Sequence, residues 1–235
     1  MRPAALAALM MVAACGGGDD DGGSGDIDGG VDVDAASATD AARADAGPAA
    51  DLLIRNEETS DSIEIVEQEF DESSCALAEA CVGAPGTRTL LRFDVAVTNQ
   101  GQVAFELPDR LEGDPWVYAA CHDHFHLEGF SRYELIDDGD NVVATTSFDA
   151  SCVVDFEQVT PDGPAEAVFQ CPDPQGVSVG WAWVSTGADV PCQWIDITGI
   201  APGDYTLRVE TNVERVVPES DFDNNAIEVP VTIPE

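Results

Sequence analysis

Residues 89–105 read TLLRFDVAVTNQGQVAF, and this stretch decides the fold class. Its first nine residues combine Leu, Val and Phe with interspersed polar residues, which is the pattern of a β-strand. The segment NQGQ at residues 99–102 has the composition of a turn, and VAF at residues 103–105 begins a second strand. The stretch therefore predicts two strands separated by a turn.

Further strands are predicted on both sides of this stretch. Strand-like runs occupy residues 51–54, 63–67, 132–136, 141–144, 205–211 and 226–233. Turn signals at residues 137–140 and 202–204 separate some of them, and residues 74–81 are expected to form a short helix. Because turns are frequent and no βαβ alternation occurs, residues 51–235 are predicted to form a mainly β domain. The expected architecture is a β-sandwich with long loops that disulfides pin.

The first 50 residues are expected to precede this domain. Residues 1–14 have the pattern of a secretory signal peptide. Arg2 supplies a positive charge at the start, and the apolar run that follows is too short to span a bilayer. The run ends in VAAC, which resembles the bacterial lipobox, so Cys15 is the predicted lipidation site. The alternative is an ordinary cleaved signal with an incidental cysteine. Residues 15–50 hold nine Gly and nine Asp and are predicted to be a disordered, acidic tether.

The expected product is an exported lipoprotein, anchored to a membrane of a bacterial cell envelope in the periplasm or at the cell surface. Its charge balance excludes two classes of partner, nucleic acid and anionic lipid bound through basic residues, and leaves a protein or small-amine partner unknown. The chain carries 46 acidic and nine basic residues, a formal net charge of −37, and all nine basic residues are arginine. Binding to nucleic acid or anionic lipid depends on Lys and Arg clusters, so neither is expected. Clustered calcium sites and adaptation to a saline medium both stay open as explanations of the acidity.

All three histidines lie in the segment CHDHFH at residues 121–126. Side chains alternate along a strand, so His122, His124 and His126 would project from one face. Three imidazoles on one face suit Cu²⁺ or Zn²⁺. In an extended strand the outer two would stand about 13 Å apart, so the segment must curve or bulge to bind one ion. The alternative is a set of surface histidines at a sheet edge.

Six cysteines remain once Cys15 is assigned to lipid, and an even number in an exported domain indicates three disulfides. They are Cys75, Cys81, Cys121, Cys152, Cys171 and Cys192. The sequence alone allows 15 pairings. No Cys-x-x-Cys pair occurs, which argues against a structural zinc knuckle or a thioredoxin-type redox motif.

Several motifs, in the right order, together resemble the lysyl oxidase family. They span nearly all of residues 51–235 and read CALAEAC at 75–81, LLRF at 90–93, WVYAACHDHFH at 116–126, FSRYEL at 130–135, DVPCQWIDIT at 189–198, PGDY at 202–205 and PESDFDNN at 218–225. The resemblance implies that the three histidines are copper ligands. It also implies three disulfides, namely Cys75 with Cys121, Cys81 with Cys192, and Cys152 with Cys171.

The chain departs from this family at the residues that form its organic cofactor. Lysyl oxidases oxidise primary amines with lysine tyrosylquinone, which forms from a lysine and a tyrosine of their own chain. The place of the lysine falls near residues 145–146 (Thr-Thr), and that of the tyrosine falls near Thr186. Lysine tyrosylquinone is therefore not expected. Tyr133 and Tyr205 match structural positions of the family, and Tyr118 is expected to be a packed aromatic rather than a quinone precursor.

A second metal site is implied near the C-terminus. The segment ESDFDNN at residues 219–225 offers the carboxylate and amide oxygens that Ca²⁺ prefers. The family binds calcium at the matching positions, and the resemblance implies these ligands: Asp51, the main-chain carbonyl of Leu52, Glu219, Asp221, Asn224 and Asn225. The alternative is an acidic turn before the last strand.

Three functions are compatible with these features. The first is a lipid-anchored copper-binding domain that has lost the amine oxidase cofactor. The others are an active copper-dependent oxidoreductase acting on primary amines, and a non-catalytic, calcium-stabilised binding or adhesion module. Asp123 and Glu128 flank the histidines and could act as a base or as partners of imidazole N–H groups. On so acidic a surface such neighbours arise by chance, so no catalytic residue is assigned.

Overall fold

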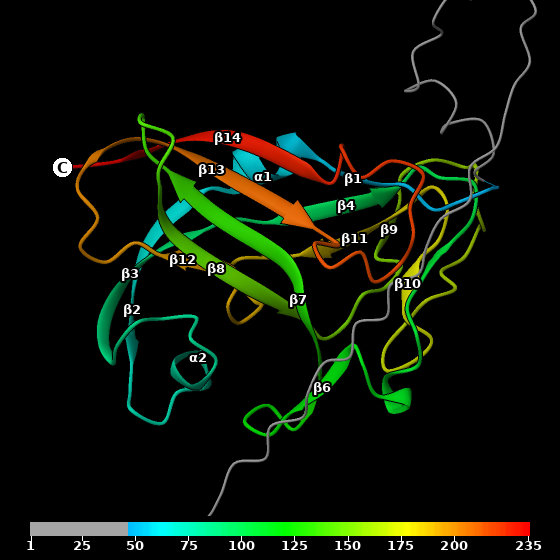
Figure 1. Cartoon of the computed structure of the whole chain (residues 1–235), viewed down its shortest axis with the longest axis horizontal. Helices are drawn as coiled ribbons and strands as arrows, with labels where there is room; N and C mark the ends of the chain where they lie inside the picture. Colours follow the sequence, from blue (N-terminus) through cyan, green and yellow to red (C-terminus); the bar gives the residue numbers. More distant parts are fainter. Residues whose placement is uncertain (1–46) are drawn as a thin grey trace, which may run out of the picture. The chain divides into compact units, whose positions relative to one another are not determined.

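The computed structural model describes residues 47–235. The predicted signal peptide, Cys15 and residues 15–46 of the predicted tether lie outside the described residues. Within residues 47–235, no helix is long and apolar enough to cross a membrane. Strands dominate this part of the chain (Figure 1), and the prediction of a mainly β fold is confirmed.

The largest sheet has five antiparallel strands and holds the histidine segment. Its strands are β6 (Trp116–Ala119), β7 (His124–Ile136), β8 (Val142–Ala150), β13 (Gly203–Thr211) and β14 (Ala226–Ile233). The long strand β7 lies at the centre, because it pairs with β6 near its start and with both β8 and β13 along the rest of its length. β14 pairs with β13 at the edge.

Three smaller sheets complete the fold. They run in the orders β1-β4-β11-β9, β12-β3-β2 and β10-β5. The strands are β1 (Leu52–Ile54), β2 (Glu64–Phe70), β3 (Gly86–Arg92), β4 (Val95–Asn99), β5 (Phe105–Glu106), β9 (Glu157–Gln158), β10 (Gly176–Val177), β11 (Trp181–Ser185) and β12 (Trp194–Asp196). The helices are α1 (Asn56–Ser62), α2 (Cys75–Ala78) and the 3₁₀ turn η1 (Arg110–Glu112).

Aromatic side chains join the five-stranded sheet to the sheet that contains β4 and β11. Trp183 on β11 packs edge-on against Phe130 on β7, with ring centres 5.6 Å apart, and lies 6.3 Å from Phe148 on β8. Phe93 packs edge-on against Tyr133 of β7 at 4.9 Å. All five rings are buried in one continuous core. Two sheets packed face to face around such a core form a β-sandwich.

The run at residues 89–97 forms two strands of different sheets, whereas the sequence predicted one. The chain crosses between the sheets at Asp94, which α1 holds in place. Thr59 Oγ1 donates a hydrogen bond to the Asp94 carbonyl (2.9 Å), and the Asp94 N–H donates to Ser62 Oγ (2.8 Å). β4 is buried at all five positions, and the consecutive residues Leu90 and Leu91 of β3 are both buried, so the pattern of apolar residues along the chain does not reveal the crossing.

Several other elements differ from the prediction in their bounds. β7 begins at His124 rather than at residue 132, and β8 ends at Ala150 rather than at residue 144. α2 covers Cys75–Ala78 rather than residues 74–81, and β5 begins at Phe105 rather than at residue 103. α1 was not predicted.

Three disulfides hold the long loops of the described domain. Cys75–Cys121 joins α2 to the turn before β7, and Cys81–Cys192 joins the segment after α2 to the approach to β12. Cys152–Cys171 closes the loop between β8 and β10. These are the same three pairs that the resemblance implies.

Candidate metal centre

The histidine segment is a turn followed by a strand. β6 and β7 form a hairpin in which Ala119 is paired with His124, so β7 begins at His124 and His122 lies in the turn. Asp123 adopts the left-handed conformation with φ of 59°, which aspartate tolerates better than most residues. The N–H groups of His122 and Asp123 both donate to the Ala119 carbonyl, at 3.1 and 2.9 Å. The expectation that all three histidines occupy one strand is therefore wrong for His122, and the turn supplies the curvature that the segment needed.

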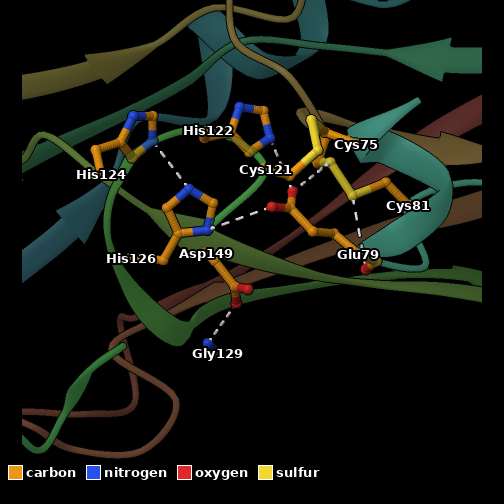
Figure 2. A network of polar contacts seen from close by, with 10 residues as sticks. Cys75, Glu79, Cys81, Cys121, His122, His124, His126, Gly129 and Asp149 are labelled. Carbon is orange, nitrogen blue, oxygen red and sulfur yellow. Dashed lines mark hydrogen bonds and ion pairs between the residues drawn. A yellow bond between two sulfur atoms is a disulfide. The ribbon is translucent and has the colours of Figure 1, made fainter. Parts of the chain in front are cut away.

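The turn brings the three imidazole rings together (Figure 2). Their centres are 5.3 Å apart for His122 and His124, 5.4 Å for His122 and His126, and 4.9 Å for His124 and His126. A histidine nitrogen lies about 2.0–2.1 Å from a bound Zn²⁺, so two rings on one tetrahedral ion have centres roughly 5 Å apart. All three separations are close to this value, and the ligand atoms that lie within 4.8 Å of one another are those of Glu79, His122 and His126. His124 is not central between the other two, because the rings form a nearly equilateral triangle.

The rings line a small cavity of about 60 Å³. His126 is buried, and His122 and His124 are partly buried. Burial lowers the pKa of His124 below its usual value, and the neighbouring His126 and His122 lower it further. Neutral imidazole is the form that binds a metal ion, so this environment favours ligation. The other cavity residues are Glu79, Cys81, Ser147, Asp149, Ser151, Val190, Pro191 and Cys192.

Glu79 is a member of this cluster that the sequence analysis missed. It caps the C-terminal end of α2, and its Oε2 lies 3.1 Å from His122 Nε2 while its Oε1 lies 4.0 Å from His126 Nδ1. On the other side of His126, Nε2 lies 3.0 Å from His124 Nε2. The signal in the sequence was indirect. Glu79 stands between Cys75 and Cys81 in the sequence. The disulfides of these two cysteines connect to Cys121, which directly precedes His122, and to Cys192, which lines the cavity (Figure 2).

The predicted neighbours of the histidines have other contacts. The Tyr118 hydroxyl donates a hydrogen bond to Asp123 Oδ1, which raises the pKa of Tyr118 above its usual value. The Tyr118 ring packs edge-on against Phe125, with centres 5.4 Å apart. Glu128 is exposed and lines a different cavity. Neither Asp123 nor Glu128 has a hydrogen bond or ion pair with a histidine among the contacts of the described residues.

The positions that would form the family's quinone carry threonines. Thr146 is buried on β8 and paired across the sheet with Tyr133, and Thr186 donates a hydrogen bond to Asp189 (3.2 Å). Tyr133 is itself fully buried, and its hydroxyl donates to Gln193 Oε1 (2.9 Å). A threonine hydroxyl supplies neither the phenol nor the amine that this quinone is made from. The residues present therefore do not fit lysine tyrosylquinone.

The residues of the implied calcium site are brought together from the two ends of the domain. The Leu52 N–H donates to Glu219 Oε2 (2.5 Å), and Asn224 Nδ2 donates to Asp51 Oδ1 (2.8 Å). Asn225 donates to Glu219 Oε1 (2.8 Å). Asp221 accepts a hydrogen bond from the N–H of Asp223 in the same loop.

The donor set at this place fits a hard cation. Burial raises the pKa of Glu219, although hydrogen bonds from Asn212, the Leu52 N–H and Asn225 oppose the shift. The side-chain oxygens of Asn212, Asn224 and Asn225 are buried without a hydrogen-bond partner. Buried unpaired oxygens are uncommon in proteins, and together with the carboxylates of Asp51 and Glu219 they are the ligand type that Ca²⁺ takes. Asn212 was not among the predicted residues.

Comparisons with known proteins agree with the motifs. A profile described as lysyl oxidase matches residues 50–234. Lysyl oxidase homolog 2 of Mus musculus is 32% identical over 188 residues, which cover 75% of this chain and 24% of that protein. Protein-lysine 6-oxidase of Homo sapiens is 37% identical over 164 residues, which cover 65% and 38%. Lysyl oxidase homolog 1 of Homo sapiens is 36% identical over 164 residues, which cover 65% and 28%.

This chain thus spans about a quarter to two fifths of the length of these relatives. The profile covers the whole mainly β domain together with the histidine turn, the three disulfides and the loop at Glu219. The chain belongs to the lysyl oxidase family.

Proposed function

We propose that this protein is an exported, lipid-anchored copper-binding member of the lysyl oxidase family that does not carry out quinone-dependent amine oxidation. The single observation that supports copper binding is the triangle of three imidazole rings with centres 4.9–5.4 Å apart. Imidazole is a good ligand for copper, and the family of this chain is copper-dependent. Copper is preferred to zinc on that ground.

In this proposal the three histidines hold the ion beside the turn of the β6–β7 hairpin. Bound copper supplies one-electron chemistry at that position. The rest of the cavity restricts what reaches the ion, because it is small and is walled by the Cys81–Cys192 disulfide, Val190 and Pro191. No side chain is assigned a proton-transfer step.

The lipid anchor is proposed from the VAAC segment alone, with Cys15 as the modified residue. The three disulfides of the described domain are typical of proteins exposed to an oxidising compartment, which supports export. Detergent partitioning of a Cys15→Ser variant tests the anchor, and an unchanged partition coefficient would exclude it.

We also propose a structural calcium site at Asp51, Leu52, Glu219, Asp221, Asn224 and Asn225. The unpaired, buried oxygens of Asn224 and Asn225 support it. Such a site would hold the start of β1 against the loop before β14, and its test is given in the Discussion at the scale of the whole molecule.

The copper proposal is tested with the purified protein and defined amounts of Cu²⁺. The expected result is about one tightly bound Cu²⁺ per chain, with histidine nitrogens as ligands in the electron paramagnetic resonance (EPR) spectrum. Loss of His122, His124 or His126 to alanine should each weaken binding severely, because the triangle gives the three rings equivalent places.

A Tyr118→Phe variant is the matched control, since it lies beside the histidine turn and should bind copper as the wild type does. If the wild-type protein fails to bind stoichiometric copper under these conditions, the copper proposal is wrong. The calcium-stabilised binding or adhesion module then becomes the better interpretation.

A further inference from the structure

We propose that Glu79 is a positioning residue of the metal centre, which accepts a hydrogen bond from the ligand His122 and lies beside a second ligand, His126. The inference rests on the proposed copper function and extends it to a residue outside the histidine segment. Glu79 lies 43 residues before His122 in the chain, and it reaches the cluster only through the fold.

The contacts divide the ring nitrogens into two sets. Glu79 Oε2 is 3.1 Å from His122 Nε2, which is a hydrogen-bond distance, and Oε1 is 4.0 Å from His126 Nδ1, which is close but too long for a hydrogen bond. The opposite nitrogen of His126, Nε2, faces His124 Nε2 at 3.0 Å. One of these two nitrogens carries the hydrogen of this contact, and a bound ion would replace that hydrogen.

This division leaves one nitrogen of each ring available for the ion. His122 keeps Nδ1, and His126 and His124 keep Nε2, while the Glu79 carboxylate accepts the Nε2–H of His122 and lies 4.0 Å from Nδ1 of His126. A carboxylate that accepts the outer N–H of a ligand histidine fixes the tautomer and orientation of the ring and makes it a better donor to the metal. Here the carboxylate accepts the outer N–H of His122, and it also lies beside His126 (Figure 2).

The fold holds Glu79 firmly in this place. Its N–H donates to the Cys75 carbonyl (2.9 Å) at the end of α2, and Oε2 lies 3.9 Å from Cys192 Sγ. The disulfides to Cys121 and Cys192 tie the residues on both sides of Glu79 to the walls of the site. Among the described residues, the ion pairs of Glu79 are with histidines and none is with an arginine. The carboxylate is therefore free to serve the imidazoles.

The neighbouring sulfur atoms are excluded as metal ligands. Cys81 and Cys192 lie close enough to Glu79 to complete a metal-binding group. They are joined to each other as a disulfide, so neither offers the thiolate that binds metal ions.

The test compares Glu79→Gln with Glu72→Gln. Both substitutions remove one negative charge from the same segment. Glu72, however, is exposed, and none of the hydrogen bonds or ion pairs of the described residues joins it to a histidine. Outer carboxylates of this kind typically contribute about 10–100-fold to metal affinity. We expect the Kd for Cu²⁺ to rise by that factor in Glu79→Gln and to stay within about twofold in Glu72→Gln, with three nitrogen ligands still present in the EPR spectrum of both.

The second measurement needs no copper. The chain has only three histidines, so ¹⁵N-histidine NMR of the metal-free protein resolves six ring nitrogens. In the wild type, His122 should carry its hydrogen on Nε2 and His126 on Nδ1. In Glu79→Gln both tautomer preferences should weaken. A general loss of packing would lower the melting temperature without this selective change.

The outcomes separate this inference from the copper proposal. Wild-type tautomers other than these, or unchanged tautomers and unchanged Kd in Glu79→Gln, would overturn the role of Glu79 while copper binding stands. Loss of a directly bound oxygen ligand from the EPR spectrum in Glu79→Gln would show that Glu79 itself binds the ion. That result would also overturn the positioning role. Failure of the wild type to bind copper would overturn the proposed function, and the NMR result would still decide whether Glu79 orients the rings.

Discussion

At the scale of single residues, three threonines stand at the positions that would form the family's quinone. The family's quinone needs a lysine amine and a tyrosine ring, and residues 145, 146 and 186 are threonines in a chain that contains no lysine. Tyr133 and Tyr205 do not replace the missing ring. Tyr133 is buried and bonded to Gln193, and the Tyr205 hydroxyl donates to the Ala201 carbonyl. Burial also raises the pKa of Tyr133, which opposes formation of its phenolate.

We therefore expect copper-loaded protein to release no hydrogen peroxide from alkylamines and to form no coloured adduct with phenylhydrazine. The physical reason is that the carbonyl group with which phenylhydrazine reacts has no precursor at the family's positions. A copper-dependent adduct would contradict the prediction. The Tyr118→Phe variant would then show whether that half-exposed ring is its source.

At the scale of elements, α2 and the histidine turn act as one unit. Cys75 and Cys121 join them, with Cys121 directly before His122 and Cys75 one turn before Glu79. The two sides of the metal centre thus come from segments that share no strand pairing. A third disulfide, Cys152–Cys171, lies in a separate loop and provides a comparison.

Removing the Cys75–Cys121 bridge with a pair of serines should lower both stability and copper affinity. A disulfide typically contributes about 2–4 kcal/mol by restricting the unfolded chain, which urea unfolding measures. The affinity should fall as well, because His122 and Glu79 lose their common anchor. A serine pair at Cys152 and Cys171 should lower stability by a similar amount and leave the Kd for Cu²⁺ nearly unchanged. Equal copper affinities in the two double variants would contradict this account.

At the scale of the whole molecule, the implied calcium site connects the two ends of the domain. Ala50 forms a parallel bridge with Glu219, and the Ser220 N–H donates to the Ala50 carbonyl (2.8 Å). The Asp51–Asn224 contact spans 173 residues. A cation here would also reduce the repulsion within a chain whose formal charge is −37.

Calcium should accordingly raise the melting temperature of the purified protein. At a concentration of about 100 times the Kd, a ligand that binds only the folded state adds about 2.7 kcal/mol. In a domain of this size that corresponds to roughly 5–10 °C.

The increase should be largely lost in Glu219→Gln, which removes a partly buried carboxylate, and kept in Asp223→Asn, which changes an exposed residue of the same loop. Equal calcium responses in the two variants would argue against a site at Glu219, and no response in the wild type would remove the site altogether.

The sequence by itself determined the mainly β class, the spacing of the three histidines and the absence of a quinone-forming lysine. These features are local, because alternation, composition and residue identity can be read along the chain. The tertiary structure alone decided that residues 89–97 divide between two sheets, that His122 lies in a turn, and that Glu79 and Asn212 join the two candidate sites. Each of these depends on contacts between distant segments, such as α1 with Asp94 or α2 with the histidine turn. Packing and disulfides bring such segments together, and a periodic pattern in the sequence carries no record of which of them will meet.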